Sequence, residues 1–520
     1  MRRVLLALAL GLLIDGLATA GRARIPAIVV RTGEGRISGR TDSHGITAYL
    51  GIPYAAPPVG NLRWRPPQPA APWHGVRIAD ELGSSCMQVK QGFRLPWTSA
   101  FMTQNAVSEN CLFLNIWTPA AGSHQKLPVM AWLHGGGNSE GSSADAIYDG
   151  KNLARKGVVV VTINYRLGAL GFLAYPALTA ESLHHSSGNY GLLDQIAALK
   201  WIHRNIAAFG GNPSIITVFG QSAGAGDTTA LMASPLGRDL FARAITESGS
   251  GRALVVRRRM SLAEAEVEGE KYAAMLGARS LRQLRALPAS DFVRPMGGVP
   301  PGLSGFGPNI DNWIITRHRP SREVPLMNGM VANDLEIGID YGRGQVPAPA
   351  TVATFEARMK AICGAEVATC LRLYPEQDDQ EADAAWLTAV RDRARVSIYL
   401  WSIRQSKRGP LYSYYFDRPE PWPQYPQFGT FHTSEVPYVF DTLYAVNRPF
   451  TYEDQSISDQ VSSYWTGFAR RGNPNGMGLV HWPRFVPDSP ITMELGARMG
   501  PIPVASSPER LRFWLHHLEQ

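Results

Sequence analysis

A serine in a glycine-flanked turn is the first residue whose type and surroundings could do chemistry. Ser222 is the centre of the Gly-Gln-Ser-Ala-Gly sequence at 220–224, between the β-branched run 215–219 and the helix-prone segment 223–232. Small residues two positions before and after a serine allow the sharp strand-to-helix turn that exposes its hydroxyl. The N-terminus of the helix then faces developing negative charge. This context predicts a nucleophile for acyl transfer.

A glycine-rich loop could supply the second part of that chemistry. The sequence His134–Gly137 directly follows the apolar run Leu127–Leu133. A tetrahedral oxyanion needs backbone N–H donors aimed at one point, and glycines let the backbone approach closely. The N–H of Ala223, the residue after the serine, would add a further donor. We therefore expect an oxyanion hole built from this loop and Ala223.

A histidine downstream of the serine would be the general base, because the chain order in such sites is serine, acid, histidine. One candidate, His432, follows the proline-rich residues 419–426 in a loop-like stretch. The residues around the other candidate histidines indicate surface, strand or turn positions. The order leaves five candidates: His318, His432, His481, His516 and His517. The pattern favours His432 without excluding the rest.

The elements that must position these residues are strands buried on both faces. Unalternating apolar runs occur at Leu127–Leu133, Val158–Ile163 and Ile215–Phe219. Such strands belong to a parallel sheet that helices cover on each side. An apolar stripe over 196–209, with Asp194 as a possible N-cap and glycines at 210–211, predicts a helix between the second and third runs. Strand, crossover helix and strand form a βαβ unit.

Downstream, the sequence becomes more helical. The clearest helix is Leu262–Leu276, with Ser261 as N-cap and Gly277 just past its end. Further strands are expected at Leu326–Met330 and Leu411–Phe416. We see no internal repeat and no linker long enough to separate domains. Although ~100–200 residues per domain is usual, one large α/β domain over 21–520 is the simplest interpretation.

Composition excludes several classes of protein. The 520 residues are 45% hydrophobic and 18% charged, with a formal net charge of +8. No low-complexity tract indicates a disordered or fibrous chain. The basic residues do not form long runs interleaved with aromatics, so nothing favours nucleic-acid binding.

The first twenty residues are typical of a signal peptide. Arg2 and Arg3 precede the apolar stretch Val4–Ile14, and Ala18–Ala20 fits a cleavage site before Gly21. This apolar stretch is too short for a bilayer, which takes about 20 residues. We expect an exported protein, periplasmic or secreted, without a stable membrane anchor.

Export permits disulfides. The four cysteines are Cys86, Cys111, Cys363 and Cys370, and four cysteines allow three pairings. Sequence order favours 86 with 111 and 363 with 370, since each pair closes a short loop. No Cys-x-x-Cys or Cys/His spacing indicates zinc, so no metal site is expected.

Further motifs resemble those of the type-B carboxylesterases and cholinesterases, a family with the α/β-hydrolase fold. They are spread over nearly the whole chain: 51–55 with 57–63, 108–115, 164–168, 188–195, 429–440 and 472–475. The resemblance implies a large, mostly parallel central sheet covered by helices on both faces, with helical insertions around an active-site gorge. It also implies a carboxylic ester hydrolase that acts on small-molecule esters without a metal or organic cofactor.

The same resemblance implies roles for individual residues. Ser222 would be the nucleophile and His432 the general base. Gly136, Gly137 and Ala223 would be the oxyanion donors. It implies a Cys86–Cys111 disulfide as well.

The third triad member is where this sequence departs from the family. The usual pattern is Gly-x-x-x-Asp-Glu-Gly, whereas residues 329–338 here contain Asp334 and Glu336. Counting five residues from Gly329 gives Asp334, which we prefer, since spacing decides whether the acid reaches the base. Glu336 would require a shift of two residues and stays open. Asp311 is a third candidate, but it resembles a structural aspartate of the family.

Two departures bear on substrate binding. Gln221 precedes the nucleophile where the family usually has glutamate, so cationic choline-like substrates would lose a favourable interaction. Asn138 replaces the usual aromatic residue after the glycines, which makes that wall of the pocket smaller and more polar. We expect both residues to contact the substrate.

A basic segment suggests an acyl preference. We hypothesise that Arg252 reaches the acyl pocket and favours acyl groups with carboxylates, because arginine can bind a carboxylate with two hydrogen bonds. Family members that remove polycarboxylic acids from fumonisin-type toxins have such specificity. The triplet Arg257–Arg259, in contrast, is expected on a solvated basic face.

Two other activities remain as alternatives. A lipase would need a lid, which the apolar residues of the 86–111 segment could form, although they could equally wall a gorge. A non-catalytic binding module is the third interpretation. Retention of Ser222, His432 and the glycine loop argues against it.

Overall fold

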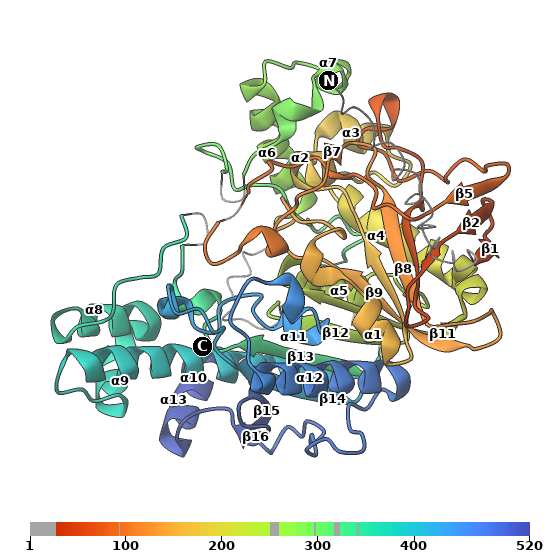
Figure 1. Ribbon diagram of the computed structural model, residues 1–520. Coiled ribbons are helices and arrows are strands. Elements are labelled where there is room, and N and C mark those ends of the chain that lie inside the picture. Colours follow the sequence, from red (N-terminus) through yellow and green to blue (C-terminus); the bar gives the residue numbers. More distant parts are fainter. Residues whose placement is uncertain are drawn as a thin grey trace, which may run out of the picture.

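The computed structural model describes residues 28–92, 94–249, 259–295, 298–316, 323–340 and 343–519. In this part of the chain an 11-stranded sheet passes through the centre of the molecule (Figure 1). The strands, in spatial order, are β16 (Gly500–Pro503), β15 (Ile491–Gly496), β14 (Leu411–Asp417), β13 (Leu326–Val331), β12 (Arg243–Glu247), β11 (Gly211–Gln221), β9 (Leu127–Leu133), β10 (Val159–Ile163), β8 (Phe113–Thr118), β4 (Thr47–Pro53) and β3 (Arg40–Thr41).

The sheet is parallel in its middle and antiparallel at both edges. Strands β10, β9, β11, β12, β13, β14 and β15 pair in parallel. The edge strands β16, β8, β4 and β3 pair antiparallel to their neighbours. The predicted runs at Leu127–Leu133 and Val158–Ile163 are β9 and β10, and β11 extends beyond the run predicted for it. The expected mostly parallel α/β architecture is confirmed.

Helices cover both faces, and β9 shows why its sequence does not alternate. Val129, Ala131 and Leu133 belong to one hydrophobic core, which includes α4 (Tyr190–Asn205). The intervening Met130 and Trp132 belong to a second core, which includes α12 (Tyr452–Arg471). Because each face of the strand meets a helix layer, every position favours an apolar residue.

Helix α4 begins four residues before its predicted N-cap. Asp194 therefore lies inside the helix, and its carboxylate accepts hydrogen bonds from Nε and Nη2 of Arg166, each at 2.7 Å. Both residues are buried, so the aspartate must face its partner rather than cap the helix. The expected N-cap role of Asp194 is therefore wrong, and its contact with Arg166 is structural. The helix ends at Asn205, and Gly210 follows with a φ of 78°.

The other predicted helix is present almost as expected. Helix α6 covers Leu262–Met275, begins with a capping box between Ser261 and Glu264, and is followed by Gly277 at a φ of 71°. The remaining helices are α1 (Lys151–Arg155), α2 (Gly168–Phe172), α3 (Pro176–Glu181), α5 (Ala223–Ala233), α7 (Leu281–Ala286), α8 (Val352–Cys363), α9 (Val367–Leu373), α10 (Asp379–Ser406), α11 (Val436–Val439) and α13 (Pro508–Glu519). Figure 1 shows α8, α9 and α13 grouped around the long α10, away from α6 and α7.

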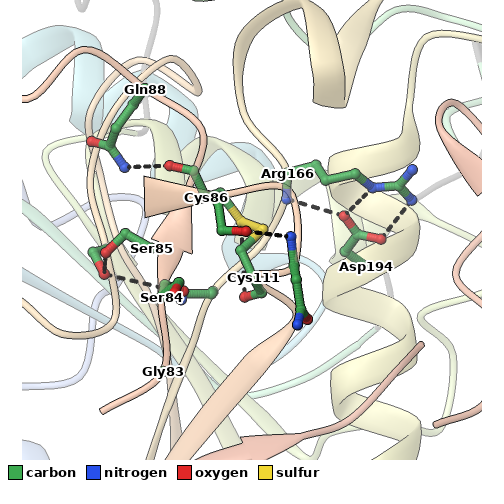
Figure 2. The surroundings of a disulfide bond; sticks show 12 residues. Gly83, Ser84, Ser85, Cys86, Gln88, Cys111, Arg166 and Asp194 are labelled. Atoms are coloured by element: carbon green, nitrogen blue, oxygen red, sulfur yellow. Dashed lines mark hydrogen bonds and ion pairs between the residues drawn. A yellow bond between two sulfur atoms is a disulfide. The ribbon is translucent and has the colours of Figure 1, made fainter. Parts of the chain in front are cut away.

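Short strands and two disulfides complete the described part. Strands β1 (Val29–Arg31), β2 (Arg36–Ser38) and β5 (Val76–Ile78) form a small sheet, and β6 (Ser85–Cys86) pairs with β7 (Val107–Ser108). The disulfides are Cys86–Cys111 and Cys363–Cys370, so both expected pairings are confirmed. Figure 2 shows the first beside the ion pair of Arg166 and Asp194.

The described residues contain no helix that is both long and apolar enough to cross a bilayer. The segment expected to be a signal peptide, 1–20, lies outside the described residues.

Candidate active site

The predicted site residues meet at the edge of the sheet where the parallel strands end. The glycine loop follows β9, Ser222 follows β11 and Asp334 comes three residues after β13. His432 lies in the loop after β14, and the N–H of Asn333 donates to the carbonyl of Thr430 at 2.9 Å. This bond joins the segment of the acid to the segment of the base. Ligand sites of parallel α/β sheets typically lie at this edge.

The turn at Ser222 has the strained backbone of a nucleophile elbow. Its φ and ψ are 57° and −122°, and its N–H donates to the carbonyl of Glu247 at 2.8 Å. A Cβ on Gly224 would lie 2.0 Å from the carbonyl oxygen of Leu133, and one on Gly220 would lie 2.7 Å from that oxygen. Strand β9 therefore passes too close for any side chain at either glycine.

The glycine loop is bent around the nucleophile. Gly136 and Gly137 have φ values of 100° and 61°, which favour glycine. Both line a cavity together with Ser222, and Ala223 lines an adjoining cavity that Ser222 shares. The structure thus brings the three expected oxyanion donors to the walls around the serine.

His134, which begins the glycine loop, supports the loop. Its ring stacks on Tyr165 with centroids 4.4 Å apart, and the Tyr165 hydroxyl donates to the His134 carbonyl at 2.7 Å. Burial lowers the pKa of His134 to about 4, so its imidazole is neutral at physiological pH. A neutral ring that packs against an aromatic side chain fixes the loop without adding charge beside the serine.

The residues expected to be the base and the acid are in direct contact. His432 Nδ1 lies 2.6 Å from Asp334 Oδ1, and both side chains are buried. A carboxylate can only accept, so Nδ1 carries the proton and Nε2 keeps its lone pair. Glu336 lies in the following 3₁₀ turn, but its side chain is outside the described part of the structure. The acid brought to the imidazole is the one that the spacing favoured.

Gln221 touches the base, which sequence reasoning did not foresee. Its amide nitrogen lies 3.2 Å from His432 Nε2, and its side chain is buried. Gln221 also lines the cavity that contains His432, and its contact with a substrate stays a prediction. The amide is therefore both a wall of the pocket and a donor to the nitrogen that would accept the serine proton.

Two cavities meet at the serine. One has a volume of about 220 Å³ and contains His432, Gln221 and the apolar side chains of Trp97, Phe101 and Tyr148. The other has a volume of about 600 Å³ and contains Ala223 and Asn138. Three residues line both: Gly137, Ser222 and Leu335. The side chain of Asn138 donates to Asp227 at 3.2 Å, so this wall is polar, as expected.

The segment 86–111, which a disulfide closes into a loop, lines part of the smaller cavity. Trp97 and Phe101 are only 8% and 7% exposed, and Trp97 Nε1 donates to the carbonyl of His432 at 3.1 Å. Arg94 in the same segment forms a buried ion pair with Glu140. These contacts hold the apolar residues against the site, as expected of a gorge wall. Phe93 lies outside the described residues.

Two buried glutamates behind the base were also not foreseen. Trp465 Nε1 donates to Glu247 at 2.7 Å, and the Ser248 hydroxyl contacts Glu435 at 3.5 Å. Burial raises the pKa of Glu247 to about 8. Burial, together with nearby Glu247 and Asp334, raises the pKa of Glu435 well above its usual range. Burial thus favours the protonated form of both groups relative to an exposed glutamate.

The basic segment departs from expectation at its last residue. Arg252, Arg257 and Arg258 lie outside the described residues. Arg259, expected on a solvated face, instead lines the larger cavity, and its Nη2 donates to the carbonyl of Gly226 at 3.2 Å. The expectation was wrong for Arg259 because the chain here lies against the first turn of α5, which a run of basic letters cannot reveal.

The remaining candidate residues lie elsewhere. Asp311 accepts from the Ser186 hydroxyl at 2.6 Å and from backbone N–H groups of 313–315, which is a turn-forming role. His517 contacts Glu366, while His318 is outside the described residues. Within the described ranges no cluster of three or more His, Cys, Asp or Glu side chains could hold a metal ion.

Comparison with known proteins gives a match along nearly the whole chain. Residues 26–514 match the carboxylesterase family. A fumonisin B1 esterase from Sphingopyxis macrogoltabida is 35% identical over 505 residues, which cover 91% of this chain and 87% of that protein.

Other relatives come from distant organisms. A human cocaine esterase is 33% identical and covers 100% of this chain and 96% of its own length. A para-nitrobenzyl esterase from Bacillus subtilis (strain 168) is 32% identical, with 90% and 96% covered.

Proposed function

The chain belongs to the carboxylesterase family, with its α/β-hydrolase fold, and we propose that it is an exported serine esterase for small-molecule carboxylic esters. It is a carboxylic ester hydrolase like its relatives. The observation that carries the finer proposal is the 2.6 Å contact of Asp334 with His432, which lines the same cavity as Ser222.

The reaction proceeds through an acyl-enzyme. Ser222 Oγ attacks the ester carbonyl carbon while His432 Nε2 takes its proton. Asp334 holds the imidazole tautomer and stabilises the imidazolium. N–H groups of Gly136, Gly137 and Ala223 stabilise the oxyanion, and the loss of one such donor typically lowers kcat ~10²–10³-fold. The leaving alkoxide then takes the proton from His432, and water attacks the acyl-enzyme with His432 again as base.

The position of His432 supports a division of the ester between the two cavities. The leaving oxygen must be protonated by His432, so the alcohol occupies the smaller cavity, which contains this residue. The acyl chain extends to the other side of the carbonyl carbon. It therefore occupies the larger cavity, which contains Ala223 but not His432.

Removal of the nucleophile tests the proposal. We expect Ser222→Ala to hydrolyse p-nitrophenyl butyrate at least ~10³-fold more slowly than the native protein, because no acyl-enzyme can form. A fluorophosphonate probe should label the native protein once, at Ser222 by peptide mass spectrometry, and should not label the variant. Labelling at another serine, or full activity of the variant, would contradict the proposal.

Narrower alternatives share this chemistry. A lipase would be activated at an oil–water interface, whereas the buried contacts of Trp97 and Arg94 favour a fixed wall over a lid. An esterase for polycarboxylate esters of the fumonisin type is supported by the 35% identity with a fumonisin B1 esterase. Retention of serine, histidine and acid speaks against a non-catalytic binding module.

Export as a single 21–520 domain is part of the same proposal. Both disulfides are compatible with an oxidising compartment, either the periplasm or the medium. Terminal sequencing of the mature protein should find Gly21 first. An intact first segment in active protein would contradict the expected cleavage.

A further inference from the structure

The larger cavity has a cationic wall. Its lining includes two arginines, Arg259 and Arg294, and among its described lining residues the only acid is Asp227. Arg294 is exposed, and its Nη1 donates to two backbone carbonyls. Arg259 is the less exposed of the two. Burial lowers its pKa and the nearby Asp227 raises it, and a guanidinium stays protonated in proteins at neutral pH. The cavity therefore contains a permanent charge that water only partly screens.

The described contacts of Arg259 leave that charge without an ion-pair partner. Its Nη2 donates to the carbonyl of Gly226, which is neutral. Asp227 is near enough to act electrostatically on Arg259, but the two form no ion pair within 4.0 Å. The Asp227 oxygens instead accept amide hydrogens from Asn138 at 3.2 Å and Gln195 at 2.7 Å.

Asp227 offsets the charge only in part. Burial raises the pKa of Asp227 to about 6, so its carboxyl group is ionised at neutral pH but gives up much of that charge just below it. The two amide donors already occupy its oxygens. The guanidinium has five N–H donors, and one described bond leaves several for a ligand.

Arg259 is held close in the fold to the turn that carries Ser222. Gly226, which anchors Arg259, lies one helical turn after Ser222, and its N–H donates to the Ser222 carbonyl at 3.0 Å. Ser222 and Arg259 line the same cavity, so an acyl group held on Ser222 extends into the space that Arg259 borders.

We propose, on the basis of the serine esterase function above, that Arg259 determines specificity for acyl groups that carry a second carboxylate. The guanidinium binds the distal carboxylate with charge-assisted hydrogen bonds while the ester carbonyl lies at Ser222. Arg294 adds to the positive electrostatic potential of the cavity. Its effect on a bound carboxylate is smaller than that of Arg259 because it is exposed to water.

Two matched ethyl esters test this proposal. Monoethyl succinate and ethyl 4-methylpentanoate have nearly the same shape, but only the first has a distal carboxylate. We expect the native protein to favour the succinate ester in kcat/KM, measured by pH-stat at pH 7.5. In Arg259→Gln the ratio of the two kcat/KM values should fall about 10- to 100-fold, the usual effect of one charged hydrogen-bonded contact.

Two variants make the result specific. Arg259→Lys keeps the charge but loses the planar donors, so it should recover part of the ratio. Arg282→Gln removes an exposed arginine of α7 outside the cavity and should leave the ratio of the native protein unchanged. A native preference for the neutral ester, or an unchanged ratio in Arg259→Gln, would overturn the proposal. Hydrolysis of neither ester would instead contradict the proposed serine esterase function.

Discussion

At the residue scale, the acid of the proposed triad is one of two carboxylates two positions apart in the sequence. Asp334 contacts His432 Nδ1, so we expect Asp334→Asn to lower kcat ~10³–10⁴-fold, because an amide no longer enforces the required tautomer. Glu336→Gln is the matched comparison, and kinetics on p-nitrophenyl butyrate would rank the two variants. The larger loss in Glu336→Gln would show that the acid had been misassigned.

Gln221 makes a second prediction at this scale. A glutamate in its place would put a negative charge beside His432 Nε2 and stabilise the imidazolium. The pKa of the base would rise, so the acidic limb of the kcat/KM profile should move up by roughly one pH unit. Gln221→Met removes the amide without adding charge and should move the limb less. Identical profiles for both variants would exclude an electrostatic role for this position.

Local sequence could predict the nucleophile but not its surroundings. The strained turn at Ser222 depends on neighbours within two positions, so its signal is contiguous. The contact of Gln221 with His432 joins residues 211 positions apart, and the glutamate pair joins the end of β12 to the start of α11. The expected surface position of Arg259 was wrong for the same reason. Its place in the larger cavity comes from a contact with Gly226 of α5 and not from its basic neighbours in the sequence.

At the scale of elements, we expect both disulfides to stabilise the fold but only one of them to affect catalysis. The loop-entropy relation gives about 3.5 kcal/mol for the 25-residue separation of Cys86–Cys111 and about 2.4 kcal/mol for the 7-residue separation of Cys363–Cys370. Replacing either pair by alanines should lower the free energy of unfolding by roughly these amounts, measured by denaturant titration.

Activity should distinguish the two disulfides more clearly than stability does. The segment 86–111 carries Trp97, which donates to the carbonyl of the base. Loss of its disulfide should therefore raise KM and lower kcat in protein that is still folded. The Cys363–Cys370 pair joins α8 to α9, outside both cavities, and its loss should change neither constant. Equal kinetic effects would contradict a wall role for segment 86–111.

Elements were predictable where one physical demand dominated. Strands β9 and β10 have a helix layer on each face, so their apolar runs stand out, and the capping box of α6 marks its start. The predicted start of α4 was wrong because Asp194 forms a buried ion pair with Arg166 inside the helix, which the local sequence does not reveal. Strand β12 was not identified because its polar residues at 246 and 247 are buried by contacts from elsewhere in the chain.

At the scale of the whole molecule, buried acids should shape the dependence of stability on pH. Glu247 has a pKa of about 8 in the folded protein, above the ~4.3 of an unfolded chain. Between these values the folded state binds more protons, so this group makes stability fall as pH rises. Burial of His134, with a pKa of about 4, acts oppositely between pH 4 and ~6.5.

A variant isolates the contribution of the glutamate. In Glu247→Gln the melting temperature should decline less steeply between pH 6 and 9 than in the native protein, since the buried group no longer titrates. Differential scanning calorimetry across this range provides the slope. Glu270→Gln, an exposed position of α6, should keep the native slope. Parallel slopes in all three proteins would show that Glu247 is not the group responsible.

The meeting of two cavities at one serine has an evolutionary consequence. Only Gly137, Ser222 and Leu335 belong to both walls. Substitutions in walls without shared contacts combine nearly additively in free energy. Substitutions in one wall can thus change the specificity for the acyl group of the ester without changing the specificity for its alcohol group. Substitutions in the other wall can do the reverse. The two cavities of such an enzyme can therefore diversify independently while the nucleophile between them stays the same.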